Sequence, residues 1–339
     1  MASSRTLRVL VGALASCTLA AIVAACSGTS AQAIDPGVAD AGKNAADGSG
    51  TGSDAGGSGG GSTLEAGCAQ QAAQICAHYK ECLPTTFAIL ARDQADCEAL
   101  FTRSCVYYGG VVDSQYTGND AIACGKVYAA TSCVGTISCA IVPGKRKTGA
   151  PCQWSASCAS GYCAVAAAGT CGICVDTVAQ GQACSTTSPC DRVNGMYCGP
   201  SNTCVPYGQA GADCGAPSQP LCTLGLSCVA GKCGTGGQLG DACDAMHPCD
   251  FTKASTCDIQ NKCSAFPTGT SGDACGGTTK VSLCTGGSCV TDAGQSMGTC
   301  QNNLAEGAAC DPKVGPRCAF IYTCGSAGKC ALPEDLGCN

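Results

Sequence analysis

Histidine and aromatic side chains are scarce in this chain. The 339 residues include two histidines, His78 and His247, and one tryptophan, Trp154, and aromatic residues make up 4% of the sequence. A hydrolytic triad needs a histidine or an equivalent base beside its nucleophile, and no phosphate-binding loop, dinucleotide fingerprint or His-Glu-x-x-His motif is present. We therefore expect a protein that is not an enzyme, with no catalytic, cofactor-binding or metal-binding residues and no aromatic platform for sugars.

Charged residues are also few, at 12% of the sequence. Without Arg5 and Arg8 in the N-terminal segment, 16 basic and 24 acidic side chains remain, a formal charge of −8. A negative chain does not suit a polyanion, so we expect no nucleic-acid partner. Residues 145–147 (Lys-Arg-Lys) form the one basic cluster, which we interpret as an exposed, protease-sensitive linker rather than an anion contact.

Long apolar runs are missing except at residues 9–25, which follow a short basic start. This is the layout of a secretory signal, and the run is too short and too rich in alanine for a good membrane span. It ends in Val23-Ala24-Ala25-Cys26, which resembles the bacterial lipobox. The resemblance implies that residues 1–25 are a lipoprotein signal peptide and that Cys26 is acylated on its sulfur and, after cleavage, on its amino group.

A lipidated Cys26 predicts an exported, membrane-anchored protein, because two or more acyl chains hold a protein stably where one does not. Ser27 rather than aspartate follows it, which by resemblance to Gram-negative sorting rules implies the outer membrane. Cleavage after Ala33 is the alternative, because residues 31–33 also have the small-x-small pattern. Residues 26–63 are otherwise rich in Gly, Ser and Ala, and predict a flexible linker spanning roughly 30–36 Å.

Cysteine is the abundant residue, with 36 in the chain, a density typical of a disulfide scaffold. Residues 64–140 carry eight cysteines among helix-forming residues, and we predict three helices at about 65–82, 91–107 and 119–132. In an antiparallel helical hairpin, contacting residues have a nearly constant sum of positions. Spacing therefore favours Cys82–Cys97 and Cys76–Cys105 as two rungs of one ladder, although other partners remain open.

From residue 149 to 339 the chain repeats, with six four-cysteine modules that each open with Gly-x-x-Cys. A unit of about 30 residues is too small to fold on a core alone, and two interleaved bridges would hold it. We expect the first cysteine to pair with the third and the second with the fourth. The modules with identical spacing then predict the bonds Cys184–Cys198, Cys190–Cys204, Cys243–Cys257 and Cys249–Cys263.

The fold expected is small and disulfide-rich: a three-helix, bridged domain followed by an elongated array of modules with little regular structure, each touching mainly its neighbours. Cys174 and Cys338 exceed the four-cysteine pattern, and they would either pair across the array or remain as reactive thiols. Zinc binding is the alternative to disulfides for such cysteines, but an exported chain with an even number favours disulfides.

The modules resemble the Dickkopf N-terminal type of cysteine-rich repeat. The resemblance is carried by the Gly-x-x-Cys openings, by Gly161-Tyr162-Cys163, and by the closing triplets Gly231-Lys232-Cys233 and Gly328-Lys329-Cys330. The whole chain resembles uncharacterised cysteine-rich lipoproteins of Gram-negative soil bacteria, which pair a small helical domain with such repeats. This resemblance implies a scaffold and supplies no catalytic residue.

Three functions are compatible with these observations. The first is a non-enzymatic surface or periplasm-facing lipoprotein that contacts an unknown protein or an envelope polysaccharide, for adhesion, matrix or envelope interaction. The second is a protease inhibitor that presents loops between cysteines. The third is a thiol oxidoreductase centred on Cys171 and Cys174, the one Cys-x-x-Cys in the chain. His78, four residues before Cys82, has metal-ligand spacing, but we expect both histidines to be surface residues.

Overall fold

The computed structural model describes residues 62–338 apart from gaps at 135–136, 138, 166–169, 193, 217–218, 254, 277–282, 293–294 and 313–314. The predicted signal peptide, the acylated Cys26, the alternative cleavage site and nearly all of the predicted linker lie outside the described residues. Within the described residues, none of the helices combines the length and the apolarity that crossing a bilayer requires.

Four α-helices lie in the first part of the described chain: α2 (Leu64–Cys82), α3 (Pro84–Leu90), α4 (Gln94–Gly109) and α5 (Gly118–Ala130). Three begin at residues whose side chains accept a hydrogen bond from the first turn, at Thr63, Asp93 and Thr117. Thr117 and Asp120 form a reciprocal capping box. The three expected helices are present, and α3, which begins with proline at its first position, is an addition.

Two of the bridges predicted for the helices are wrong. Cys76 is bonded to Cys97 and Cys105 to Cys68, so neither Cys76–Cys105 nor Cys82–Cys97 forms. Both observed pairs have positions that sum to 173, as rungs of one antiparallel ladder should. The predicted ladder was displaced because α3 fills the connection between α2 and α4 and shifts their register.

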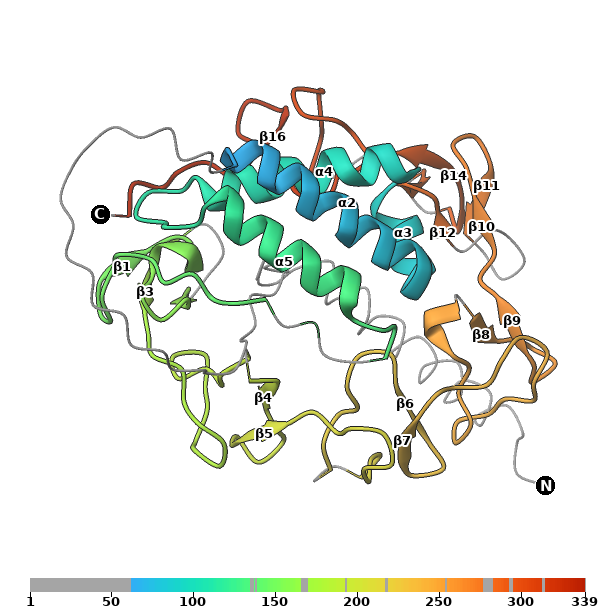
Figure 1. Cartoon of the computed structure of the whole chain (residues 1–339). Helices are drawn as coiled ribbons and strands as arrows, with labels where there is room; N and C mark the ends of the chain where they lie inside the picture. The colour runs from blue at the N-terminus through green and yellow to red at the C-terminus, as the bar shows by residue number, and fades with distance from the viewer. Residues whose placement is uncertain are drawn as a thin grey trace, which may run out of the picture.

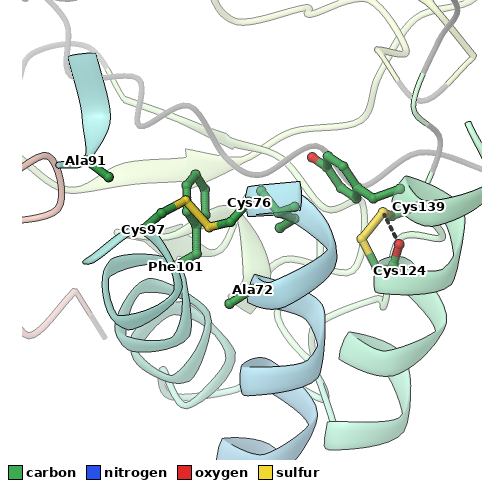
Figure 2. Packing of buried hydrophobic residues seen from close by; sticks show 9 residues of the cluster. Ala72, Cys76, Ala91, Cys97, Phe101, Cys124 and Cys139 are labelled. Carbon is green, nitrogen blue, oxygen red and sulfur yellow. Dashed lines mark hydrogen bonds between the residues drawn. A yellow bond between two sulfur atoms is a disulfide. The ribbon is translucent and has the colours of Figure 1, made fainter. Parts of the chain in front are cut away.

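The remaining helical cysteines fasten α2 and α5 to the chain that follows α5. Cys82 is bonded to Cys133 and Cys124 to Cys139. Figure 2 shows two of the bridges inside the packed cluster of buried residues around Ala72 and Phe101. Disulfides therefore form part of the hydrophobic core itself.

Helix α2 packs closely against α5 because glycines face each other where the two helices meet. A Cβ added to Gly67 would lie 2.1 Å from the carbonyl oxygen of Gly118, far inside van der Waals contact. Neither position can carry a side chain without separating the helices.

The rest of the chain consists of the six modules, each built on short strands. These are β1 (Pro151–Cys152), β2 (Cys163–Ala164), β3 (Gly172–Cys174), β4 (Met196–Cys198), β5 (Cys204–Pro206), β6 (Ser227–Val229), β7 (Lys232–Gly234), β8 (Ser255–Cys257), β9 (Cys263–Ala265), β10 (Thr268–Gly269), β11 (Ala274–Gly276), β12 (Leu283–Cys284), β13 (Gly287–Thr291), β14 (Met297–Asn302), β15 (Thr323–Cys324) and β16 (Cys330–Ala331). Two 3₁₀ turns, η1 (Ser155–Ser157) and η2 (Phe251–Lys253), accompany them.

A hairpin in every module places the third and fourth cysteines directly opposite each other, as at Cys198 and Cys204. Opposite residues of an antiparallel pair project from the same face, so both sulfurs point toward the first and second cysteines. Within all six modules the bonds join the first cysteine to the third and the second to the fourth. The sulfur pairs are the core of each module.

The glycine that opens each module is required by its backbone. All six have a positive φ, from +78° at Gly181 to +98° at Gly272, and a Cβ at any of them would meet no atom within 4 Å. In every module the amide of this glycine donates to the carbonyl of the fourth cysteine, for example from Gly240 to Cys263 at 2.7 Å. The left-handed turn therefore closes each module onto its own hairpin.

The array is not elongated, contrary to the prediction. It curves around the helices, and the red C-terminal end of the chain lies on the same side of the helical region as the green first module (Figure 1). Leu100 of α4 packs against Ala319 and Ile321 of the last module, and the amide of Gly286 in the fifth donates to the carbonyl of Ala88 in α3 at 2.7 Å. The modules touch the helices as well as each other because the helices offer them apolar surface that would otherwise face water.

Candidate functional site at the ring closure

The two ends of the module array meet beside the C-terminal end of α4. The chain after β16, residues 333–338, is called here the closing segment. Tyr107 of α4 donates its hydroxyl to the carbonyl of Pro333 at 2.5 Å. Gln153 of the first module donates to the carbonyl of Glu334 at 2.6 Å and accepts from the amide of Leu336 at 2.7 Å. The closing segment is therefore held by both the helices and the first module.

A disulfide between Cys171 and Cys338 completes this closure. Cys338 forms a long-range bridge, as one of the two predicted alternatives required, but it is bonded to Cys171 and not to Cys174. Cys174 is the fourth cysteine of the module and is bonded to Cys158. The Cys171–Cys338 bond links the last module covalently to the first and so closes the six modules into a ring. Each of the other module bonds is internal to one module.

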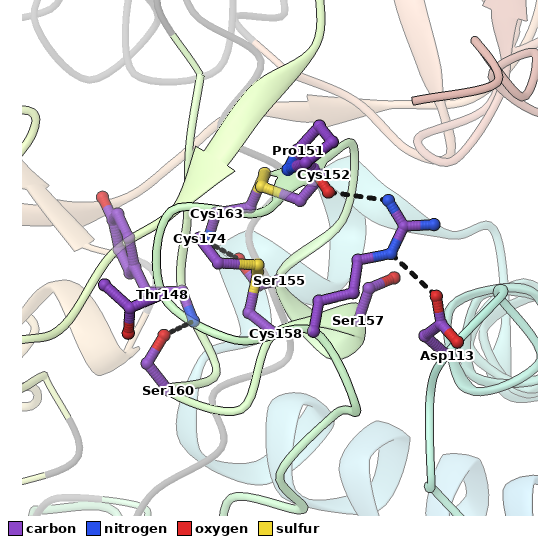
Figure 3. Close-up of a disulfide and its surroundings, with 12 residues drawn as sticks. Asp113, Thr148, Pro151, Cys152, Ser155, Ser157, Cys158, Ser160, Cys163 and Cys174 are labelled. Atoms are coloured by element: carbon purple, nitrogen blue, oxygen red, sulfur yellow. Dashed lines mark hydrogen bonds and ion pairs between the residues drawn. A yellow bond between two sulfur atoms is a disulfide. The ribbon is translucent and has the colours of Figure 1, made fainter. Parts of the chain in front are cut away.

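Arg146 joins the three parts of the chain that meet at the closure. Its Nε donates to a carboxylate oxygen of Asp113, after α4, at 2.8 Å, and its Nη1 donates to the carbonyl of Pro151 in the first module at 2.7 Å. The contacts to Asp113 and Pro151 are drawn in Figure 3. Nη1 also donates to the carbonyl of Cys338.

The interpretation of residues 145–147 as an exposed linker is therefore wrong for Arg146. Its side chain is only 14% exposed, and its backbone pairs with Cys158 of the first module. The guanidinium group presents several donors in a fixed plane, which suits it to holding a carboxylate and two carbonyls that belong to separate segments.

Three of the few aromatic residues gather at the closure. Trp154 makes edge-to-face contacts with Tyr107 and Tyr108, with ring centroids 5.6 Å and 5.2 Å apart, and the two tyrosines contact each other at 5.1 Å. The edge of one ring meets the face of the next, an arrangement that favours a fixed relative orientation. The low aromatic content of the sequence predicts no aromatic platform, but the fold brings three aromatic side chains together here.

A cleft of about 220 Å³ opens between these groups. Tyr107 and Val112 line it from the helical side, Arg146 and Trp154 from the first module and its approach, and Asp335 from the closing segment. Burial, together with the nearby carboxylate of Asp335, raises the pKa of Tyr107. The phenol therefore stays protonated at neutral pH and donates to Pro333.

The Cys-x-x-Cys pair of the oxidoreductase hypothesis is divided between two bonds. Cys171 is bonded to Cys338 and Cys174 to Cys158, so no bond joins the two cysteines of the motif. In at least five modules three cysteine sulfurs come within 4.8 Å of one another, a separation that thiolates around a metal ion also have. All of them are oxidised to disulfides here, which have no thiolate to offer a metal.

The two histidines have different environments. His78, expected at the surface, is buried: its ring meets that of Tyr128 at 5.7 Å, and burial lowers its pKa. Its Nδ1 lies 3.9 Å from the sulfur of Cys82, which is bonded to Cys133. His247 is an exposed residue of the fourth module, and its Nδ1 lies 3.0 Å from a carboxylate oxygen of Asp244.

One sequence signal could have identified the correct bridge. Cys289 and Cys300, the third and fourth cysteines of the fifth module, are 11 residues apart, and Cys163 and Cys174 have the same separation. That match marks Cys174 as the fourth cysteine and leaves Cys171 as the additional one. For Arg146 the corresponding signal is its position three residues before an opening glycine. In every module the residue at that position pairs through its backbone with the second cysteine of the same module.

A comparison with protein-family models finds no match, and comparisons with curated proteins and with solved structures find none either. The function must therefore be argued from the residues of the site.

Proposed function

We propose that this chain is a non-enzymatic binding scaffold of a bacterial envelope, anchored through a lipid on Cys26 and presenting its ring of modules to a protein or polysaccharide partner. The observation that carries the proposal is the closure of the array by Cys171–Cys338. A ring that is fixed before binding loses little conformational entropy when it binds, so a modest contact area can still give useful affinity.

The module loops support this proposal because they expose apolar and polar side chains from a rigid frame. Ile259, at the tip of the β8–β9 hairpin, is 98% exposed, and Leu221 of the third module is 60% exposed. The turn beneath Ile259 is held by Asp258, whose carboxylate accepts from the amides of Gln260 and Lys262 at 2.9 and 3.0 Å. Exposed side chains on such turns are suited to contact, since the backbone beneath them is fixed by hydrogen bonds and disulfides.

The anchor and the linker supply position and reach. Acyl chains on Cys26 would hold the protein at a membrane, and the residues up to 63 would let the ring sample the space above it. Replacement of Cys26 by serine should move the protein from the membrane fraction to the soluble one. Intact-mass analysis of the wild-type protein should show cleavage before residue 26 and the added acyl chains.

Binding is tested with envelopes from the producing bacterium and purified full-length chain carrying Cys26→Ser, which avoids insertion of the lipid. Saturable binding that weakens when Cys171 and Cys338 are both replaced by serine is expected. Absence of saturable binding to intact envelopes, to purified outer membranes and to isolated envelope polysaccharide would overturn the proposal.

A further inference from the structure

The cleft at the ring closure has an aromatic wall and a polar rim. We propose that it binds one sugar unit of a neutral envelope polysaccharide, with Trp154 as the stacking surface. This inference rests on the scaffold function proposed above and specifies the partner of that scaffold. The argument depends on the aromatic wall, the polar groups, the charge and the size of the cleft.

Trp154 is the surface suited to a sugar ring. One side of a pyranose ring presents C–H groups that pack favourably on an aromatic face, and tryptophan offers the largest such face. Trp154 is half-buried, and Tyr107 and Tyr108 hold it by edge-to-face contacts. Its indole is therefore oriented before any ligand arrives, which lowers the entropy cost of binding.

The polar rim offers hydrogen-bonding groups that are already oriented. Gln153 is fixed by its two bonds to the closing segment, and a primary amide that makes one donor and one acceptor bond has further capacity for both. Asp335 accepts from the amide of Gly337 with Oδ1 at 2.9 Å, and its second oxygen is a separate acceptor. Tyr107 donates to Pro333, and its oxygen can still accept. Sugar hydroxyls both donate and accept, so they match this mixed set.

The charge balance of the cleft favours a neutral ligand. Arg146 is paired with Asp113 and donates to two carbonyls, so its positive charge is already compensated. Asp335 adds a negative charge to the rim. A phosphate or carboxylate ligand would meet that charge without a free cation in the lining to offset it, because Arg146 is the one cationic residue among the described residues that line the cleft.

The size of the cleft sets the size of the ligand. A volume of about 220 Å³ lies below the ~300–1,000 Å³ of pockets that hold drug-sized molecules. One hexose ring fits such a space, and the open side lets the rest of a polysaccharide chain continue into solvent. Because one sugar unit makes few contacts, we expect a dissociation constant on the order of 1 mM for a free monosaccharide.

Trp154 also provides the test, because it is the only tryptophan in the chain. Intrinsic tryptophan fluorescence of the full-length chain with Cys26→Ser therefore reports on this cleft alone. The probes are glucose, galactose, mannose, N-acetylglucosamine and N-acetylgalactosamine, with glucuronic acid and inorganic phosphate as charged counterparts. We expect a saturable change in emission with at least one neutral sugar, and a response at least tenfold weaker with both charged probes.

Variants test whether the sugar binds in the cleft or elsewhere on the molecule. Trp154→Ala should abolish sugar binding measured by calorimetry, and Asp335→Asn should weaken it several-fold. Tyr207→Ala is the matched control, since Tyr207 stacks on Tyr197 in the second module, at a centroid distance of 4.7 Å, and it should bind sugar like the wild type. Every variant is first checked for the wild-type disulfide map, so that a loss of binding is not a loss of fold.

The outcomes distinguish this inference from the scaffold function. Saturable binding to envelopes without any response to neutral sugars would overturn the cleft assignment and leave the scaffold proposal intact. A response to phosphate or glucuronate that exceeds the response to every neutral sugar would also overturn it. Sugar binding that is unchanged in Trp154→Ala would show that the sugar binds elsewhere. Sugar binding in the cleft without envelope binding would refute the scaffold and support the site.

Discussion

Cys338 is bonded to Cys171, 167 positions earlier in the chain, and this bond joins the last module to the first. Among the described residues, the other sixteen bonds span between 11 and 51 positions and lie within residues 68–139 or within single modules. The molecule is thus a set of small units, each bridged internally, with one covalent link that determines how the whole is arranged.

Loss of the closing bond should open the ring without unfolding its parts. In the chain-entropy model, a cross-link over such a long loop stabilises the closed arrangement by about 4–5 kcal/mol. Each hydrogen bond of the closing segment contributes about 1 kcal/mol, so no single one of them replaces the bridge. The double variant Cys171→Ser/Cys338→Ser should therefore show a larger radius of gyration in small-angle scattering and faster proteolysis at residues 333–338.

The matched control removes a bridge of the same chemistry that does not close the ring. Cys184→Ser/Cys198→Ser deletes a bond that spans 14 positions inside the second module. It should loosen that module locally and leave the radius of gyration unchanged. If both double variants scatter alike, noncovalent contacts alone maintain the ring.

Alanine at an opening glycine should destabilise its module. Gly240 has a φ of +91°, where an L-residue is strained by about 1–2 kcal/mol. Gly240→Ala should therefore speed hydrogen exchange at the amide of Cys263, which donates to Asp241 at 2.8 Å, by about 5- to 30-fold. Gly234→Ala is the control, because Gly234 lies in β7 outside the positive-φ set and its Cβ would also meet open space. Equal effects of the two variants would contradict the conformational explanation.

The contact between α4 and the last module should depend on packing more than on charge. Leu100 is 9% exposed and packs on Ala319 and Ile321, so Leu100→Ala should loosen the last module by about 2–5 kcal/mol. The nearby ion pair of Arg103 and Glu306 joins side chains that are 45% and 43% exposed, and Arg103→Ala should cost less than about 1 kcal/mol. Hydrogen exchange of β15 and β16 measures both. A larger effect from Arg103→Ala would mean that the contact is mainly electrostatic.

Mild acid should destabilise the helical region through His78. Burial against Tyr128 lowers its pKa below the ordinary value of 6.5, and this outweighs the opposing effects of the Tyr128 backbone and the Glu81 carboxylate. Between the lowered pKa and 6.5 the unfolded chain binds more protons than the folded one, so stability is complete above pH 6.5 and falls as the pH drops through the folded-state value. Denaturant melts of α2 followed by circular dichroism should show this loss.

The variant His78→Phe tests the assignment of this pH dependence. Phenylalanine keeps a ring beside Tyr128 and cannot be protonated, so the variant should melt at the same denaturant concentration at pH 5 and pH 7. A pH dependence that persists in His78→Phe would assign the effect to other groups.

Local features of this chain could be predicted well from sequence because their causes are local. The helices follow caps such as Thr63, and each module follows from a glycine and four cysteines within about 30 residues. Bridges between helices could not be predicted to the same degree, because a short helix such as α3 shifts the register of its neighbours while leaving the hydrophobic pattern almost unchanged. Cys76 illustrates this, because it is bonded to Cys97 and not to Cys105. The two observed pairs still have the constant sum of positions expected for an antiparallel hairpin.

The ring and its cleft were beyond sequence reasoning for another reason. Tyr107, Arg146 and Trp154 are scattered along the chain, and they reach the closing segment only because the modules curve around the helices. Considered one at a time, the repeats predict a linear array of modules. The curvature of the array arises from contacts with the helices, such as the one between Gly286 and Ala88. The extra pair of cysteines was the one visible sign that the ends of the array meet.

For the export that we propose, the position of Cys338 would also set an order of events. Cys171 would reach an oxidising compartment with the first module, and its partner would follow 167 residues later, after the cysteines of every other bridge. Until then Cys171 has to persist as a thiol or as a temporary mixed disulfide while thirty-two other cysteines find their partners. A chain interrupted anywhere in the array would retain that unpaired thiol, and quality-control oxidoreductases could distinguish it chemically from a finished molecule.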